Sequence, residues 1–532
     1  MKIFTFLLFL ACFFLTNNLI AQFTQIDVQS YKIDLTVTNV SDTILVKEKI
    51  SFDYIDFKKP PSFNLVSIHK TGKGMHVTNV FQGKNKIEFS HENNVLTLTN
   101  FQSNNSKKCE IEIHFKGVPI DGLVIGKNKF GSRTFFGDNW PNRAQNWFAC
   151  NDHPSDKATV EYVVTAPSMY EVVANGEFIS KKTNKKTTIY QYKSSVVLPT
   201  KVMVVGIANL VEKQSGTVAG ISVFSAVYPE NEKGAFYDFD LAPAILQFFI
   251  DYIAPYEYEK LTNVQSTTRF GGMENAGCIF YDENSINGSR SSENLIAHEI
   301  VHQWFGNSAS EKEWSHIWLS EGFATYLTNI YVQKTKGEGA FQAQMEKDRS
   351  KVVAFSKKYN HAVVDTNYTD LMDLLNPNSY QKGGWVLHLL RNEIGDSLFH
   401  LTIQTYYRKF RLSNADTKDF QEVVESVAER DLDWFFKQWL YRGGLPTLNI
   451  SKKIDHSNIT LSIVQQDAIY RFPLSFEVKL KNGEIYQEKI QITDKETIFK
   501  KSYGTDIQSC KIDPRIELLY QDLNESKKVR LE

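Results

Sequence analysis

Cysteine is scarce in this sequence, and the few cysteines show no ordered spacing. The 532 residues contain five cysteines, and no two of them form a C-x-x-C pair. This scarcity excludes both the disulfide framework of a small secreted domain and a cysteine-rich zinc site. Four cysteines lie beyond the first 21 residues, and we expect them to be buried free thiols. A disulfide between Cys109 and Cys150 is the alternative.

An excess of charge of either sign is also missing. The chain has 60 Lys and Arg residues against 61 Asp and Glu residues, which gives a net charge of -1. No basic block interrupts this balance, so neither nucleic acid nor an anionic lipid surface is expected as the main partner. The sequence also lacks internal repeats and low-complexity linkers.

Long apolar runs are absent after the N-terminus. At the N-terminus, Lys2 precedes IFTFLLFLACFFL, and a short polar patch leads to Ala21. This pattern is typical of a secretory signal peptide and is too short and one-sided for a membrane span. We predict a signal peptide at residues 1–21, with cleavage after Ala21 and export to the periplasm or the medium. An uncleaved N-terminal anchor is the alternative.

The hydrophobic pattern changes twice along the chain and divides it into three parts. Short alternating runs such as YKIDLTVTNV and CEIEIHF predict an antiparallel β domain at residues 22–215. Longer-period segments such as FDLAPAILQFFIDYIAPY and TKDFQEVVESVA predict a mainly helical domain at residues 216–444. Alternation returns in NITLSIVQQ and LSFEVKL and predicts a small β-sandwich and a tail at residues 445–532. The predicted fold class is therefore α+β and multidomain.

Two histidines with a glutamate between them lie in NLIAHEIVHQWFGN, a helical segment for which Ser291 is the expected N-cap. His298 and His302 are four residues apart, so both imidazoles leave one face of the helix and can bind one metal ion. Glu299 points about 100° round the helix, where it is no obvious ligand but can act as a general base on a water. A catalytic zinc takes a third protein ligand, and Glu321, nineteen residues after His302, supplies a carboxylate. The alternative is a solvated helix face with two incidental imidazoles.

A glycine pair precedes this motif in RFGGMENAGCIFYD. Gly271 and Gly272 permit close backbone approach, and alone they could mark a bulge or a tight turn. Beside a metal-binding helix they suit an edge strand that accepts a peptide by main-chain pairing. Glu274 follows directly and is placed to bind a cation.

With these motifs the chain resembles the M1 family of zinc aminopeptidases, the gluzincin group that includes leukotriene A4 hydrolase. The resemblance rests on HEIVHQWFGN, GGMEN, WSHIWLSEGFATYL, SYQKGGWVLHLL and, in the N-terminal part, CNDHPSDKAT. It implies a thermolysin-like, mainly helical catalytic domain behind an N-terminal β domain. It also implies a short form without the C-terminal helical domain of many relatives, and therefore a cleft that is more open on one side.

Carried over to this sequence, the resemblance implies one zinc ion per chain, bound by His298, His302 and Glu321. Glu299 is then the base that deprotonates the attacking water. Tyr380, in the Y-x-K-G pattern, corresponds to the tyrosine that hydrogen-bonds the developing oxyanion.

The resemblance also assigns substrate binding to five consecutive residues: Gly271, Gly272, Met273, Glu274 and Asn275. Glu274 binds the free α-amino group, and the backbone from Gly271 to Met273 pairs with the substrate. Met273 is also expected to line the pocket for the first residue. Because an internal peptide has no ammonium to offset a buried carboxylate, only N-terminal cleavage is expected. Relatives often hold the amine with a further side chain from the N-terminal domain, and here GDNWPNRA offers Asp138 or Asn139.

The predicted function is release of N-terminal residues from peptides by an exported zinc aminopeptidase. One alternative is additional epoxide hydrolysis, because WSHIWLSEG shares its His before Trp-Leu with the leukotriene-processing relative. A second alternative is a catalytically silent module that captures peptide N-termini, against which the presence of Glu299 and Tyr380 argues. The sequence indicates neither the preferred first residue nor the oligomeric state.

Overall fold

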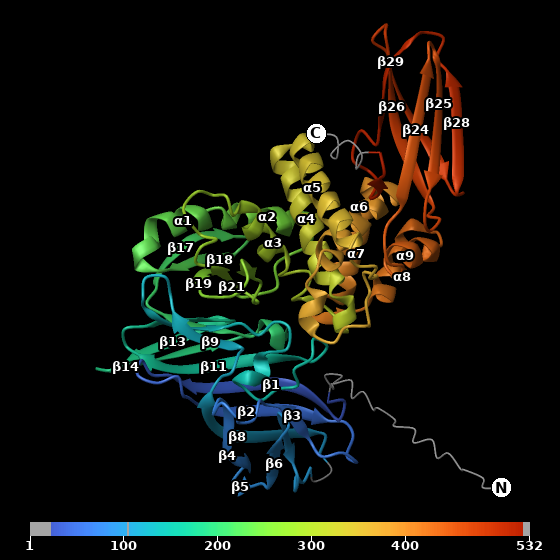
Figure 1. The fold of residues 1–532 in the computed structure, drawn as a ribbon. Helices are drawn as coiled ribbons and strands as arrows, with labels where there is room; N and C mark the ends of the chain where they lie inside the picture. Colours follow the sequence, from blue (N-terminus) through green and yellow to red (C-terminus); the bar gives the residue numbers. More distant parts are fainter. Residues whose placement is uncertain (1–22, 104–105, 525–532) are drawn as a thin grey trace, which may run out of the picture.

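The computed structural model describes residues 23–103 and 106–524. An N-terminal β-rich region is followed by a central region with most of the helices, and strands return after residue 447 (Figure 1). The predicted signal peptide at residues 1–21 lies outside the described residues. Among the residues that are described, no helix is both long and apolar enough to span a bilayer.

The N-terminal region is organised around one large sheet in the order β13-β14-β11-β1-β2-β8-β4-β5, with β15 paired to β11. These strands are β13 (Glu177–Thr183), β14 (Thr187–Lys193), β11 (Lys157–Pro167), β1 (Ile26–Thr36), β2 (Ile44–Tyr54), β8 (Lys108–Val118), β4 (Gly74–Gln82), β5 (Asn85–Lys86) and β15 (Leu198–Pro199). Buried residues alternate with more exposed ones along β2, which places its apolar side chains on one covered face. The prediction of purely antiparallel pairing is wrong for β1 and β11, which pair in parallel.

Two smaller sheets complete the N-terminal region. One has the order β12-β16-β10-β9, and the other has the order β3-β7-β6. Their strands are β12 (Glu171–Ala174), β16 (Val205–Ala208), β10 (Arg133–Gly137), β9 (Leu123–Lys127), β3 (Ser62–Asn64), β7 (Val95–Leu98) and β6 (Phe89–Glu92). The loop after β10 carries Trp140, which contributes to the cavity described below.

The central region starts with a five-stranded sheet in the order β17-β18-β19-β21-β20. Its strands are β17 (Val211–Val218), β18 (Ile221–Val227), β19 (Lys260–Ser266), β21 (Cys278–Asp282) and β20 (Gly272–Met273). The helices α1 (Glu232–Phe239) and α2 (Ala242–Tyr252) lie against this sheet (Figure 1). β20 is the edge strand, so one side of its backbone is open to pairing with another chain.

The remaining helices form a bundle around α4. They are α3 (Glu293–Val301), α4 (Trp318–Lys336), α5 (Glu338–Ser356), α6 (Gly383–Ile394), α7 (Asp396–Phe410), α8 (Thr417–Ala428) and α9 (Asp433–Trp439). Because α4 packs against α3, α5 and α6, most of its residues are buried. The N-cap of α3 is Ser292 rather than the predicted Ser291, and the Ser292 hydroxyl donates to the Ser285 carbonyl instead of capping the helix.

The strands after residue 447 form two further sheets, ordered β28-β25-β24-β30 and β27-β26-β29. They comprise β24 (Thr447–Asp455), β25 (Asn458–Gln465), β26 (Phe472–Leu480), β27 (Ile485–Ile492), β28 (Glu496–Ser502), β29 (Ile507–Ile512) and β30 (Gln521–Asp522). Phe476 of β26 contacts Phe499 of β28 with 5.0 Å between ring centroids, so the two sheets share a core. The expectation of buried free thiols is confirmed for Cys109, Cys150, Cys278 and Cys510.

Candidate active site

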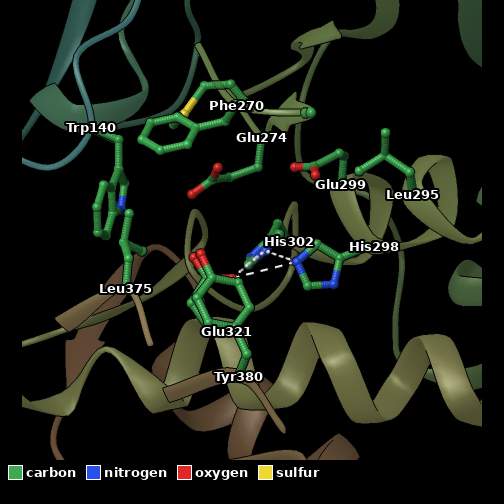
Figure 2. A pocket seen from close by; sticks show the side chains of 13 residues that line it. Trp140, Phe270, Glu274, Leu295, His298, Glu299, His302, Glu321, Leu375 and Tyr380 are labelled. Carbon is green, nitrogen blue, oxygen red and sulfur yellow. Dashed lines mark hydrogen bonds and ion pairs between the residues drawn. The ribbon is translucent and has the colours of Figure 1, made fainter. Parts of the chain in front are cut away.

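Two histidines and one glutamate converge where α3 and α4 pack together. His298 lies in α3, His302 directly follows its last residue, and Glu321 lies in the first turn of α4. The two Nε2 atoms are 3.1 Å apart, and the Glu321 Oε2 atom is 3.4 Å from that of His298 and 3.2 Å from that of His302 (Figure 2). The structure therefore brings together the three side chains that the sequence predicts as metal ligands.

The spacing of these three atoms fits a tetrahedral zinc ion. Bonds of about 2.0–2.1 Å at tetrahedral angles place neighbouring ligand atoms about 3.3 Å apart. The His302 Nδ1 atom is 3.1 Å from the Phe305 carbonyl oxygen, which only accepts, so this nitrogen carries the proton. The lone pair of Nε2 is then directed to the side of His298 and Glu321, as metal binding requires.

The site has an excess of buried negative charge. Burial lowers the pKa of His302, but the carboxylates of Glu321, Glu274 and Glu299 outweigh it and raise that pKa to about 10. Burial raises the pKa of Glu274 and raises that of Glu299 well above its ordinary value. Desolvation is the main cause of both shifts, so a divalent ion at the histidines would stabilise the ionised carboxylates.

Glu299 and the glycine-rich strand β20 are in direct contact. A Cβ atom on Gly272 would lie 2.3 Å from the Glu299 Oε1 atom, so the Glu299 side chain would have to move. At Gly271 the nearest atom to such a Cβ would be 3.6 Å away. Gly272 is therefore required for close approach to Glu299, whereas Gly271 is under no such steric constraint.

Glu274 follows β20 and has a buried carboxylate without a cationic partner. The residue is 5% exposed, and its Oε1 atom has no hydrogen-bond partner among residues 23–103 and 106–524. Its main-chain carbonyl accepts hydrogen bonds from Gln303 Nε2 at 2.8 Å and Asn307 Nδ2 at 2.6 Å. Gln303 and Asn307 lie within HEIVHQWFGN, but nothing in the sequence pattern indicates that they hold the main chain at Glu274.

Tyr380 lies in η6 (Asn378–Lys382), a short π-helix that leads into α6. Its ring is parallel to that of His298, with 6.2 Å between centroids. Burial, together with the carboxylates of Glu321 and Glu274, raises the pKa of Tyr380 well above its ordinary value. The hydroxyl group therefore keeps its proton and can donate a hydrogen bond into the site.

All the predicted site residues except Asn275 line one cavity of about 260 Å³. Four further residues contribute to its wall, namely Trp140, Phe270, Leu295 and Leu375. Asn275 is buried outside the lining, and its amide atoms have no hydrogen-bond partner within the part of the chain that the structure describes. The sequence did not single out these four residues, because each is apolar and reads as packing: Phe270 and Leu295 lie beside the GGMEN and HEIVH motifs, Trp140 lies in GDNWPNRA, and Leu375 lies in a segment without a motif.

Asp138 and Asn139, the two candidates for an additional amine contact, do not line this cavity. Asp138 is fully buried and forms an ion pair with Arg143. Asn139 donates to the carbonyls of Thr200 and Met203. Both side chains are thus occupied by the protein itself, and it is their neighbour Trp140 that reaches the cavity.

Comparison with known protein families is consistent with this geometry. The family model described as Peptidase family M1 domain matches residues 237–439, which include the metal cluster, Glu274 and Tyr380. The family model described as Peptidase M1 N-terminal domain matches residues 28–202. Together the two models cover most of the N-terminal and central regions.

Similar proteins with curated descriptions are aminopeptidases. Probable aminopeptidase 1 of Sulfurisphaera tokodaii is 24% identical over 439 residues, which are 76% of this chain and 53% of the relative. Leucyl aminopeptidase of Saccharolobus solfataricus is 23% identical over 498 residues, 87% of this chain and 61% of the relative. Glutamyl aminopeptidase of Rattus norvegicus is 28% identical over 335 residues, 59% of this chain and 35% of the relative. The chain spans about half the length of the curated relatives that it matches.

Proposed function

Because this chain belongs to peptidase family M1, we propose that it is a zinc-dependent aminopeptidase that hydrolyses the first peptide bond of peptides with a free N-terminus. One observation carries the proposal. The buried carboxylate of Glu274 lies without an ion-pair partner, among the described residues, in the cavity that contains the His298, His302 and Glu321 cluster. Such a carboxylate suits a substrate ammonium group next to a hydrolytic centre.

His298, His302 and Glu321 would hold the zinc ion. When bound, zinc supplies a Lewis acid that polarises the substrate carbonyl and lowers the pKa of a water molecule. The Phe305 carbonyl would orient His302 for this task by accepting a hydrogen bond from its Nδ1 atom.

Glu299 would accept the proton of the attacking water and transfer it to the departing amine nitrogen. The C–O bond forms first, and the C–N bond breaks as the amine nitrogen takes this proton, so the products are an amino acid and a peptide shortened by one residue. Tyr380 would donate its hydroxyl proton in a hydrogen bond to the carbonyl oxygen as negative charge develops there. Burial, which raises the pKa of Tyr380, keeps that donor protonated.

Glu274 would bind the α-ammonium group of the substrate, and the free edge of β20 would pair with its backbone. An internal segment of a peptide offers no cation to this carboxylate and would leave it buried and uncompensated. The same penalty applies to an N-acetylated peptide. The proposed enzyme therefore acts only at a free N-terminus.

Hydrolysis of aminoacyl arylamides tests this proposal. A chelator should abolish turnover and zinc should restore it, and an N-acetylated substrate should not be cleaved. Glu299→Gln should keep zinc at one ion per chain but lose about 100- to 10,000-fold in kcat, the usual contribution of a general base. Stoichiometric zinc without turnover on a broad panel would contradict the proposal and favour a peptide-binding module.

Three further proposals concern the rest of the chain. We propose export to the periplasm or medium, on the basis of the apolar run after Lys2, and cell fractionation with N-terminal sequencing tests it. We propose that the two C-terminal sheets form a β-sandwich, supported by the contact between Phe476 and Phe499. We also propose that the central region is thermolysin-like, with the boundaries at residues 22–215, 216–444 and 445–532, which limited proteolysis tests.

A further inference from the structure

One side of the cavity is an apolar wall in which only Met273 has an expected role. It consists of Trp140, Phe270, Met273 and Leu375. Figure 2 shows Trp140 and Leu375 on one side of Glu274, whereas Leu295 lies on the opposite side, beyond Glu299. No Lys or Arg is among the residues that line the cavity. The wall therefore offers a side chain dispersion contacts and no charge of either sign.

The wall is held rigidly by its surroundings. Trp140 is 3% exposed and packs edge-on against Trp314, with 5.9 Å between ring centroids. Met273 is buried in β20. The part of the wall formed by Trp140 and Met273 cannot move back at low cost, so the size and shape of the bound side chain matter.

The arginines closest to this wall form ion pairs with aspartates outside the cavity. The Arg143 guanidinium group lies 6.0 Å from the centre of the Phe270 ring and pairs with Asp121 and Asp138. Arg269 also pairs with Asp121. Phe270 thus stands between the Arg143 charge and the cavity, and no cation is available to bind an acidic side chain there.

The proposed function fixes the positions of the substrate's α-ammonium group and carbonyl group. These two positions also determine where the side chain of the first residue points. If the α-ammonium group binds Glu274 and the carbonyl lies at the metal cluster near Glu299, the α-carbon lies between them. Its side chain then extends toward Trp140, Phe270 and Leu375, because the remainder of the peptide leaves along the edge of β20 on the side of Leu295.

We infer that this wall selects peptides whose first residue is large and apolar, such as leucine, methionine or phenylalanine. The inference rests on the proposed function and names the substrate class of the same site. A hydrophobic pocket discriminates about 10- to 200-fold per methylene, so alanine is disfavoured. An acidic first residue is excluded most strongly, because its carboxylate would be desolvated against a wall that has no Lys or Arg, in a cavity that already holds Glu274, Glu299 and Glu321.

The test compares kcat/KM for arylamides of leucine, methionine, phenylalanine, alanine, lysine and glutamate. We expect at least a tenfold preference for each of the first three over alanine, and still lower values for glutamate. Competitive binding of phenylalaninol and alaninol, which have no scissile bond, should follow the same order. Alanine, lysine or glutamate turned over as fast as leucine would overturn the inference.

Leu375→Arg provides the sharpest variant, because it places a cation in the wall at a half-buried position. It should raise the ratio of glutamate to leucine turnover at least tenfold, whereas the neutral control Leu375→Met should leave that ratio near its original value. An unchanged ratio in Leu375→Arg would show that the first side chain does not contact this wall. If the arylamides are hydrolysed with a different order of preference, this inference alone is wrong. If zinc binds but no arylamide is hydrolysed, both the proposed function and this inference are wrong.

Discussion

Removing the amino group of Lys201 should destabilise the protein strongly, although Lys201 does not line the active-site cavity. Lys201 and Glu311 form an ion pair in which the lysine side chain is 1% exposed and the glutamate side chain 0%. The Glu311 Oε2 atom has no hydrogen-bond partner among the described residues. Lys201→Met preserves the apolar stem of the side chain and removes only the charge. The Glu311 carboxylate would then be buried without its direct counter-ion.

The magnitude follows from the burial of both partners. Breaking a buried pair by removing one side costs about 3–5 kcal/mol, because the remaining charge stays desolvated. Lys157 does not replace Lys201 as the counter-ion of Glu311, since its side-chain nitrogen donates to the carbonyls of Asn307, Ser308 and Ser413. Replacing both partners by apolar residues is often neutral, so Lys201→Met combined with Glu311→Leu should lose about 1 kcal/mol or less.

Urea unfolding followed by circular dichroism measures the stability of both variants. The change in the free energy of unfolding is the change in the urea midpoint multiplied by the slope of the transition. Lys181→Met is the matched control, because Lys181 pairs with Glu171 at the surface, where 40% and 42% of the side chains are exposed. Such a pair contributes about 0–1 kcal/mol. The reasoning is refuted if Lys201→Met costs no more than Lys181→Met, or if the double variant is as unstable as Lys201→Met alone.

Two other changes test the site and the pH dependence of stability. Gly272→Ala puts a Cβ atom 2.3 Å from Glu299 Oε1, so it should lower kcat about 100-fold at normal zinc content, whereas Gly271→Ala, with 3.6 Å available, should lose far less. Burial raises the pKa of Asp156 from 3.8 to about 7, so the folded state binds a proton that the unfolded state has released in this window. Stability should therefore fall as pH rises from about 4 to about 7, and Asp156→Asn should reduce that slope in urea unfolding at several pH values, although Asp152 and other buried carboxyl groups contribute to it as well. An Asp156→Asn protein with the unchanged slope, or a fully active Gly272→Ala protein, would contradict these expectations.

The metal cluster was predictable from sequence to the extent that local geometry fixes it. His298 and His302 are one helical turn apart, so any helix through this segment brings their rings together. The position of Glu321 depends on how α4 packs against α3. Its spacing of nineteen residues from His302 therefore made it a candidate third ligand but did not place it beside the histidines. The resemblance to a known family, rather than periodicity, singled out Tyr380 from 24 tyrosines.

Of the wall residues, the sequence indicated only Met273, because the others are brought to it from distant parts of the fold or carry no polar group. Trp140 follows a strand of the N-terminal region, and Leu375 follows the 3₁₀ helix η5 (Leu371–Leu374). Neither segment has a periodic pattern that indicates where its side chains point. The parallel pairing of β1 with β11 escaped prediction for a related reason, since alternation reveals which face of a strand is buried but not which strand lies beside it.

The contacts between the N-terminal and central regions connect substrate selection to the stability of the fold. Trp140 comes from the N-terminal region, whereas Glu274 belongs to the central one, so the distance between wall and carboxylate depends on how the two regions are joined. Asn175, after β12, donates to the Ala276 carbonyl at 2.7 Å, two residues beyond Glu274. The Lys201 ammonium group lies 5.8 Å from the centre of the Trp314 ring, against which Trp140 packs. Because these joining contacts are buried and polar, they tolerate little displacement, and a change at Lys201 should alter the choice of first residue as well as the free energy of unfolding.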